Sequence, residues 1–151
     1  MDLLCFRLLL LPFIEQRGGF EHIYYVAVYP QPQAIALVDS YAQSKSASGA
    51  KVAVLNAVRR FVQDEYFAFH SSEFSTPPAA FDWSGWRTAS LGTLTPQQTD
   101  GCSCGIYTLL GMRALARRAP LHEVLRAEKI CRVPSYWRRR LALWLYVGKI
   151  L

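Results

Sequence analysis

The chain has 151 residues, of which 52% are hydrophobic and 19% charged, so we expect one globular domain with a buried core rather than a disordered chain. The formal net charge is +6, and basic residues are concentrated in the last third. This charge fits a solvated basic helical face or an acidic protein partner. No zinc finger, RNP-like strand or interleaved aromatic–basic pattern accompanies it, which argues against nucleic acid as the partner.

The four cysteines are too few for a disulfide scaffold in a chain of this length, which favours a reducing compartment, the cytoplasm or the nucleus. The C-x-C pair at 102 and 104 lacks the two-residue spacing of zinc ligands, and no second pair follows. The three histidines show no ligand spacing either: His22, His70 and His122. We therefore expect neither a metal nor another cofactor.

The apolar run from Leu8 to Leu11 predicts a buried strand over residues 3–11. It does not read as a signal peptide, because Asp2 stands where basic residues belong and Pro12 ends the run early. No stretch of the sequence is long enough to span a membrane.

A turn at residues 17–19 leads into a second strand at 22–29, and a loop at 30–33 connects it to a third strand at 34–39. Apolar residues at helical spacing then predict an amphipathic helix over 49–68. After an irregular segment at 71–85, a short strand at 86–90 precedes helices at about 104–118, 120–131 and 134–147. Because no repeat or linker interrupts this order, it indicates an α+β domain with a small, mostly antiparallel sheet packed against helices.

The loop before the helix at 104 carries the residues best suited to chemistry. It delivers Cys104 to the helix start, where backbone N–H groups and the helix dipole stabilise a thiolate. Gln98 lies six positions earlier (104 − 98 = 6), and its amide can donate a hydrogen bond to a developing oxyanion. A nucleophile with such a donor is suited to acyl transfer.

A base for this thiol is offered by the two neighbouring strands. His22 opens the strand at 22–29 and Asp39 closes the strand at 34–39, so an antiparallel hairpin brings them together. A carboxylate beside an imidazole fixes its tautomer and raises its basicity. Taken singly, these residues have plainer explanations: a buried cysteine, a strand-end histidine, a turn aspartate and a loop glutamine. The joint pattern favours a site.

The stretch from Pro96 to Tyr107, Pro-Gln-Gln-Thr-Asp-Gly-Cys-Ser-Cys-Gly-Ile-Tyr, resembles the active-site signature of the ubiquitin-like-protein-specific cysteine proteases. This is the SUMO-protease family, related to the adenovirus-type processing proteases, and its usual signature is P-Q-Q-x-N-x-x-D-C-G before an apolar helix. Residues 22–28 resemble the family's histidine strand, and 35–40 resemble its strand ending in Asp-Ser. The resemblance runs from about residue 8 to the end of the chain.

The resemblance implies a papain-like α+β fold of the SUMO-protease/adenain type. It implies Cys104 as nucleophile, His22 as general base, Asp39 as its orienting group, and Gln98 with the Cys104 backbone N–H as oxyanion donors. The implied reaction is hydrolysis of the peptide or isopeptide bond after the C-terminal glycine of a SUMO-like modifier. The implied partners are that modifier and its conjugates.

Three positions depart from the family pattern: Ile23 replaces a tryptophan, Asp100 an asparagine and Ser103 an aspartate. The family's domain also begins before the first strand, so residues 1–151 read as a single domain that is shortened, a fragment or a divergent copy. Alternatives to the peptidase are a catalytically inactive module that binds a modifier or another protein, and a viral or transposon-type polyprotein-processing protease. A basic nucleic-acid-binding role is a further alternative.

Overall fold

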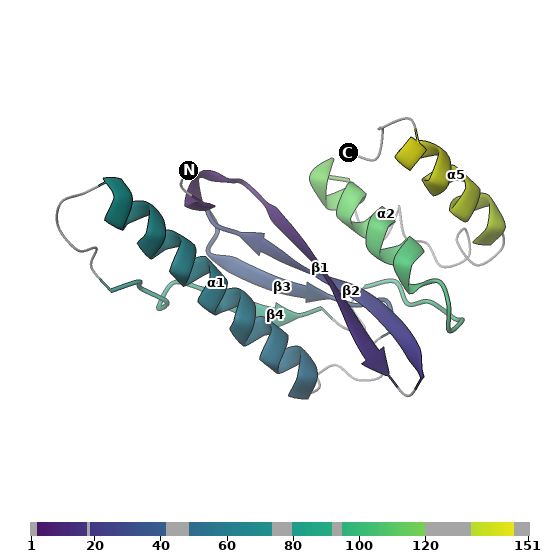
Figure 1. Ribbon diagram of the computed structural model, residues 1–151, viewed down its shortest axis with the longest axis horizontal. Coiled ribbons are helices and arrows are strands. Elements are labelled where there is room, and N and C mark those ends of the chain that lie inside the picture. The colour runs from purple at the N-terminus through teal and green to yellow at the C-terminus, as the bar shows by residue number, and fades with distance from the viewer. Residues whose placement is uncertain are drawn as a thin grey trace.

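The computed structural model describes residues 3–17, 19–41, 49–73, 80–91, 95–119 and 134–146 (Figure 1). None of the helices in these ranges is both long and apolar enough to cross a bilayer. In chain order the elements are the 3-10 helix η1 (Leu3–Cys5), β1 (Leu9–Arg17), β2 (Phe20–Tyr29), β3 (Ala34–Val38), α1 (Gly49–Glu73), β4 (Arg87–Ser90), α2 (Cys104–Ala116) and α5 (Pro134–Tyr146).

The four strands form one sheet in the order β1-β2-β3-β4. β2 pairs antiparallel with both β1 and β3, with Leu9 opposite Val28 and Tyr25 opposite Val38. β4 runs parallel to β3, so the small sheet is mixed, with two antiparallel pairings out of three. The predicted α+β class is confirmed.

The central strand β2 is buried on both faces because helices cover both sides of the sheet. Alternate residues beginning at Tyr24 face α1, and those beginning at Tyr25 face α2. Figure 1 shows α1 on one side of the sheet and α2 with α5 on the other. This double burial explains why residues 22–29 read as a nearly continuous apolar run.

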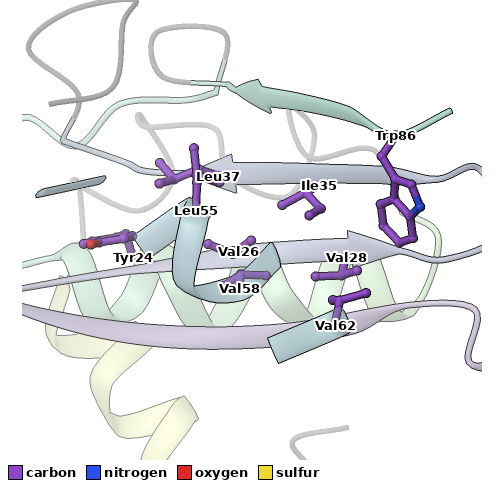
Figure 2. Close-up of a cluster of buried hydrophobic side chains, with 9 residues drawn as sticks. All are labelled: Tyr24, Val26, Val28, Ile35, Leu37, Leu55, Val58, Val62 and Trp86. Atoms are coloured by element: carbon purple, nitrogen blue, oxygen red, sulfur yellow. The ribbon is translucent and has the colours of Figure 1, made fainter. Parts of the chain in front are cut away.

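The main core lies between α1 and the sheet (Figure 2). Leu55, Val58 and Val62 recur every three or four residues along α1, so they share one helix face. They pack on β2, β3 and Trp86, and each fully buried aliphatic side chain contributes roughly 1.5–3 kcal/mol. This packing fixes α1 on the sheet, and with it the helix start near the end of β3.

The strand predicted over 3–11 is wrong in position. Residues 3–5 form η1, and β1 begins at Leu9 and continues through Pro12 to Arg17. β1 is an edge strand, so Pro12 removes no hydrogen bond that the sheet needs. Leu9 to Leu11 are half-buried, and from there to Gln16 exposed and half-buried side chains alternate, so β1 is not the fully buried strand expected.

The predicted helices differ from the observed ones at their ends. α1 extends to Glu73, five residues beyond its predicted end (73 − 68 = 5), and α2 stops at Ala116. α2 ends where Arg118 adopts φ 57°, a left-handed conformation common just after helices. The helix predicted at 120–131 lies outside the described residues.

Candidate active site

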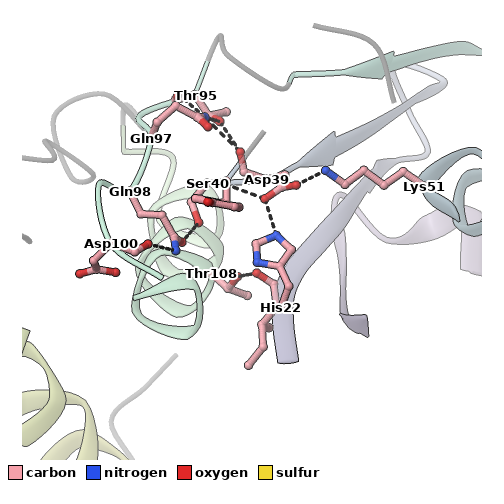
Figure 3. Close-up of polar contacts among 11 residues, drawn as sticks. His22, Asp39, Ser40, Lys51, Thr95, Gln97, Gln98, Asp100 and Thr108 are labelled. Atoms are coloured by element: carbon pink, nitrogen blue, oxygen red, sulfur yellow. Dashed lines mark hydrogen bonds and ion pairs between the residues drawn. The ribbon is translucent and has the colours of Figure 1, made fainter. Parts of the chain in front are cut away.

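His22 and Asp39, predicted as base and orienting group, meet at one end of the sheet. His22 Nε2 lies 2.7 Å from Asp39 Oδ1, and the two residues are only 2% and 0% exposed. The hairpin explains this contact, because β2 and β3 pair up to Tyr25 and Val38, just inside the two residues. Figure 3 shows the imidazole and the carboxylate facing each other across the strand ends.

Asp39 is held in its ionised form. Burial raises the pKa of this carboxyl, but hydrogen bonds from His22, Lys51 and the Tyr41 N–H outweigh burial and lower the pKa to about 2. An ionised carboxylate only accepts hydrogen bonds, so Nε2 of His22 carries the proton and donates it to Asp39. In the neutral ring, Nδ1 then holds the lone pair that a general base needs.

Lys51 is the third member of this cluster and was not among the site residues predicted from the sequence. It lies in the first turn of α1, is 6% exposed, and donates to Oδ2 of Asp39 (Figure 3). The two carboxylate oxygens of Asp39 therefore have different partners: Oδ1 contacts His22, and Oδ2 contacts the ammonium group of Lys51. A signal was present in hindsight, because a lysine in the first helical turn opposes the helix dipole.

Cys104 is the first residue of α2 and is 6% exposed. α2 packs on β2 through Thr108, whose hydroxyl donates to the Ile23 carbonyl at 3.1 Å. A Cβ on Gly105 would lie 3.6 Å from Cδ1 of Ile23. The residue after the cysteine thus lies against the residue after the histidine, so the two backbones are near neighbours. Within the described residues, the Cys104 thiol makes no hydrogen bond with the His22 imidazole.

Gln98 is fixed on the segment that follows Asp39. Its backbone N–H donates to the Ser40 carbonyl at 2.8 Å, and its side-chain Oε1 accepts from the Ser40 hydroxyl at 2.7 Å. These contacts orient the amide so that Nε2 points the other way, where it donates to the Asp100 carbonyl at 2.6 Å. A primary amide has two N–H donors, so one remains for another acceptor.

Asp100, where the family pattern has asparagine, organises the loop that leads to Cys104. Its Oδ1 accepts from the N–H groups of Cys102 and Ser103, and its Oδ2 accepts from the Ser103 hydroxyl at 2.6 Å. Burial raises the pKa of Asp100, but these bonds and nearby Arg138 lower it below the ordinary value. The departures at 100 and 103 therefore compensate each other, because Ser103 donates to the carboxylate that replaces the amide.

The loop also touches the last described helix. Nη2 of Arg138 on α5 lies 3.3 Å from the exposed Cys102 thiol. Thr95 and Gln97 donate to the Asp39 carbonyl, which ties the start of the loop to the end of β3. No cluster of three or more His, Cys, Asp or Glu side chains suited to a metal ion occurs among the described residues.

The chain matches the model of the Ulp1 protease family, C-terminal catalytic domain, over residues 2–139. The chain belongs to the Ulp1 protease family. This confirms the resemblance found in the sequence, because the Ulp1 family is the family of SUMO-type cysteine proteases. A comparison with curated proteins finds no match.

Among solved structures, the chain is similar to one described as SUMO protease Ulp1 with the catalytic cysteine oxidized to a sulfenic acid. The two share 19% sequence identity with a TM-score of 0.56, and the match covers 94% of this chain. It covers 54% of the other chain, so this chain spans about half of that protein's length. At this identity the likeness shows the fold, which is the α+β papain-like fold of the Ulp1 family.

Proposed function

We propose that this Ulp1-family domain is a cysteine peptidase that hydrolyses the peptide or isopeptide bond after the C-terminal glycine of a SUMO-like modifier. The observation that carries the proposal is the buried His22–Asp39 pair at the end of the sheet. α2 begins with Cys104, and its second residue, Gly105, lies against Ile23 at the same end. The pair supplies an oriented base, and the start of α2 supplies the thiol that would act as the nucleophile.

In the proposed reaction, the Cys104 thiol transfers its proton to Nδ1 of His22, and the thiolate attacks the carbonyl carbon of the modifier's terminal glycine. The imidazolium then gives that proton to the amine as the C–N bond breaks, so the amine leaves and the modifier remains bound to Cys104 as a thioester. Water, deprotonated by the same imidazole, hydrolyses the thioester and restores the thiol. Asp39 keeps the ring in the tautomer that leaves Nδ1 basic.

Gln98 would stabilise the oxyanion of the tetrahedral intermediates together with the Cys104 backbone N–H. The Ser40 hydroxyl supports this role, because it holds Oε1 and so turns the amide's N–H₂ group away from itself. A neutral donor stabilises the developing charge without pairing with the thiolate beforehand. Removing one such donor from comparable sites costs about 10²–10³ in kcat.

The test uses a SUMO-type modifier that carries a C-terminal vinyl sulfone, incubated with the reduced chain. We expect a covalent adduct on Cys104, located by mass spectrometry. Cys104→Ala should abolish the adduct, whereas Cys102→Ala, which removes the exposed thiol two residues away, should retain it. Absence of an adduct on the reduced native chain would refute the proposal. A ubiquitin-type probe run in parallel reports which modifier is preferred.

A second candidate is a module that binds a modifier without cleaving it. The observation in its favour is that the Gln98 amide already donates to the Asp100 carbonyl and that the Cys104 thiol makes no hydrogen bond with His22. It predicts modifier binding that survives Cys104→Ala, with no turnover by the native chain. A polyprotein-processing protease would instead turn over peptides that lack a modifier tail, which cleavage-site profiling with a peptide library detects.

A further inference from the structure

Lys51 carries its positive charge at a position that is unfavourable for a cation in two ways. It is buried, and a buried cation is costly unless it is paired. It also lies in the first turn of α1, where the helix dipole disfavours positive charge. Its ion pair with Oδ2 of Asp39 offsets both costs. A lysine held in so unfavourable a place by one carboxylate points to a role at that carboxylate.

The ammonium group lies beside Asp39 and over the Tyr24 ring. Its Nζ is 5.6 Å from the centroid of the Tyr24 ring, and the Tyr24 ring is 5.8 Å from the His22 ring. Lys51 uses only Oδ2 of Asp39, whereas Oδ1 accepts from His22 and from the Tyr41 N–H at 2.8 Å. Lys51 thus holds the carboxylate without competing for the oxygen that orients the ring.

We propose that Lys51 is a positioning residue that acts through Asp39, fixing the carboxylate and keeping the His22 imidazole neutral until it receives the proton of the thiol. This inference rests on the proposed function and deepens it. With Lys51 present, protonating the ring changes the net charge of the buried His22–Asp39–Lys51 cluster from zero to +1. Without Lys51, the same step changes it from −1 to zero, which a buried site favours.

Other groups face the His22 ring, and each is the same with or without Lys51. The rings of Tyr24 and Tyr41 lie 5.8 and 5.9 Å from it. Glu15 on β1 is its cross-strand partner and adds a carboxylate from that side. From α2, Gly105 lies against Ile23, the residue next to His22. Lys51 is therefore the cation whose removal isolates the effect of positive charge on the ring.

The test is an NMR titration of the His22 ring in the full chain carrying Cys104→Ala, which removes coupling to the thiol. Lys51→Gln keeps a hydrogen-bond donor near Asp39 but removes the charge, and Lys51→Met keeps the length of the side chain. A unit charge about 6 Å away shifts a titration by about two pH units at an effective dielectric of 20. We expect the His22 midpoint to move up by about one unit or more in both variants.

Two controls separate charge from structure. Lys51→Arg keeps the charge, and Arg60→Met removes an equal charge from an exposed position of the same helix. Both should leave the His22 midpoint within about 0.3 unit of the parent. Lys51→Arg retains the buried charge, and the charge of exposed Arg60 is screened by solvent. If Lys51 only tethers α1 to β3, Lys51→Gln lowers stability without moving the midpoint, and that result overturns the inference, as does a downward shift.

The titration uses no substrate, so its outcome is independent of the peptidase assignment. An upward shift without any adduct in the vinyl sulfone assay would retain the role of Lys51 on the ring and reject the proposed reaction. An adduct without a shift of the His22 midpoint would retain the proposed reaction and reject the role of Lys51. Should Lys51→Met fail to fold, the Lys51→Gln titration decides alone.

Discussion

Replacing Asp39 with asparagine removes the negative charge that Lys51 and His22 share. The carboxylate is fully buried and Lys51 is 6% exposed, so the ammonium group is left as an unpaired charge in the protein interior. Breaking a buried pair by removing one partner typically costs about 3–5 kcal/mol. Because the asparagine Oδ1 still accepts one hydrogen bond, we expect the lower end, about 3 kcal/mol.

The double variant Asp39→Asn/Lys51→Met separates the two consequences of that change. Removing the stranded ammonium group should restore most of the lost stability, to within about 1 kcal/mol of the native chain. It should not restore turnover, because asparagine presents an N–H to Nε2 of His22 and favours the wrong tautomer. The equivalent change in a serine protease triad lowers kcat by about 10⁴-fold.

Thermal and urea unfolding at pH 7 measure the stability, and probe labelling of Cys104 measures the activity. A loss of about 3 kcal/mol corresponds to a fall in Tm of about 6–12 °C for a chain of this size. The reasoning is refuted if Asp39→Asn lowers the free energy of unfolding by less than about 1 kcal/mol. It is equally refuted if the double variant is no more stable than the single one.

Three further predictions concern a hydrogen bond of Gln98, the close approach of Gly111 to Tyr25, and the ionisation of Asp39. Ser40→Ala leaves Oε1 of buried Gln98 without its donor, so unfolding should become easier by about 1–2 kcal/mol and Cys104 labelling slower by tenfold or more. Gly111→Ala would place a methyl group 2.6 Å from the Tyr25 hydroxyl, so we expect a loss of about 1–3 kcal/mol in urea unfolding, and an unchanged midpoint would contradict this packing. Because the pKa of Asp39 is lowered from 3.8 to about 2, its ionisation stabilises the fold above pH 4, and this contribution should disappear between pH 4 and pH 2. Asp39→Asn should lack that part of the acid dependence in unfolding curves.

The β2–β3 hairpin could be predicted from sequence because its signals are local. Residues 22–29 and 34–39 are apolar and β-branched or aromatic, and a four-residue loop allows only antiparallel pairing. The pairing of His22 with Asp39 follows from that register. The loop before Cys104 and the start of α2 could also be predicted, because the polar residues of the loop and the helical period after Cys104 are contiguous in the sequence.

The first strand was misplaced because its pairing partner, not its own composition, sets its limits. The unbroken run of leucines ends at Leu11, but the register with β2 extends β1 to Arg17, opposite Phe20. An edge strand tolerates polar residues and a proline that a central strand excludes. The parallel pairing of β4 with β3 likewise depends on the path of the chain between them, which periodicity does not encode.

The sequence by itself determined the family and the α+β class and singled out the candidate site residues, because motifs, periodicity and a hairpin are properties of neighbouring positions. Only the tertiary structure brought Lys51 to Asp39 and set Gly105 against Ile23. These contacts join segments separated by 12 and 82 positions (51 − 39 and 105 − 23). They exist because apolar faces dock α1 and α2 on opposite sides of one sheet, and the charges at the sheet end follow from that docking.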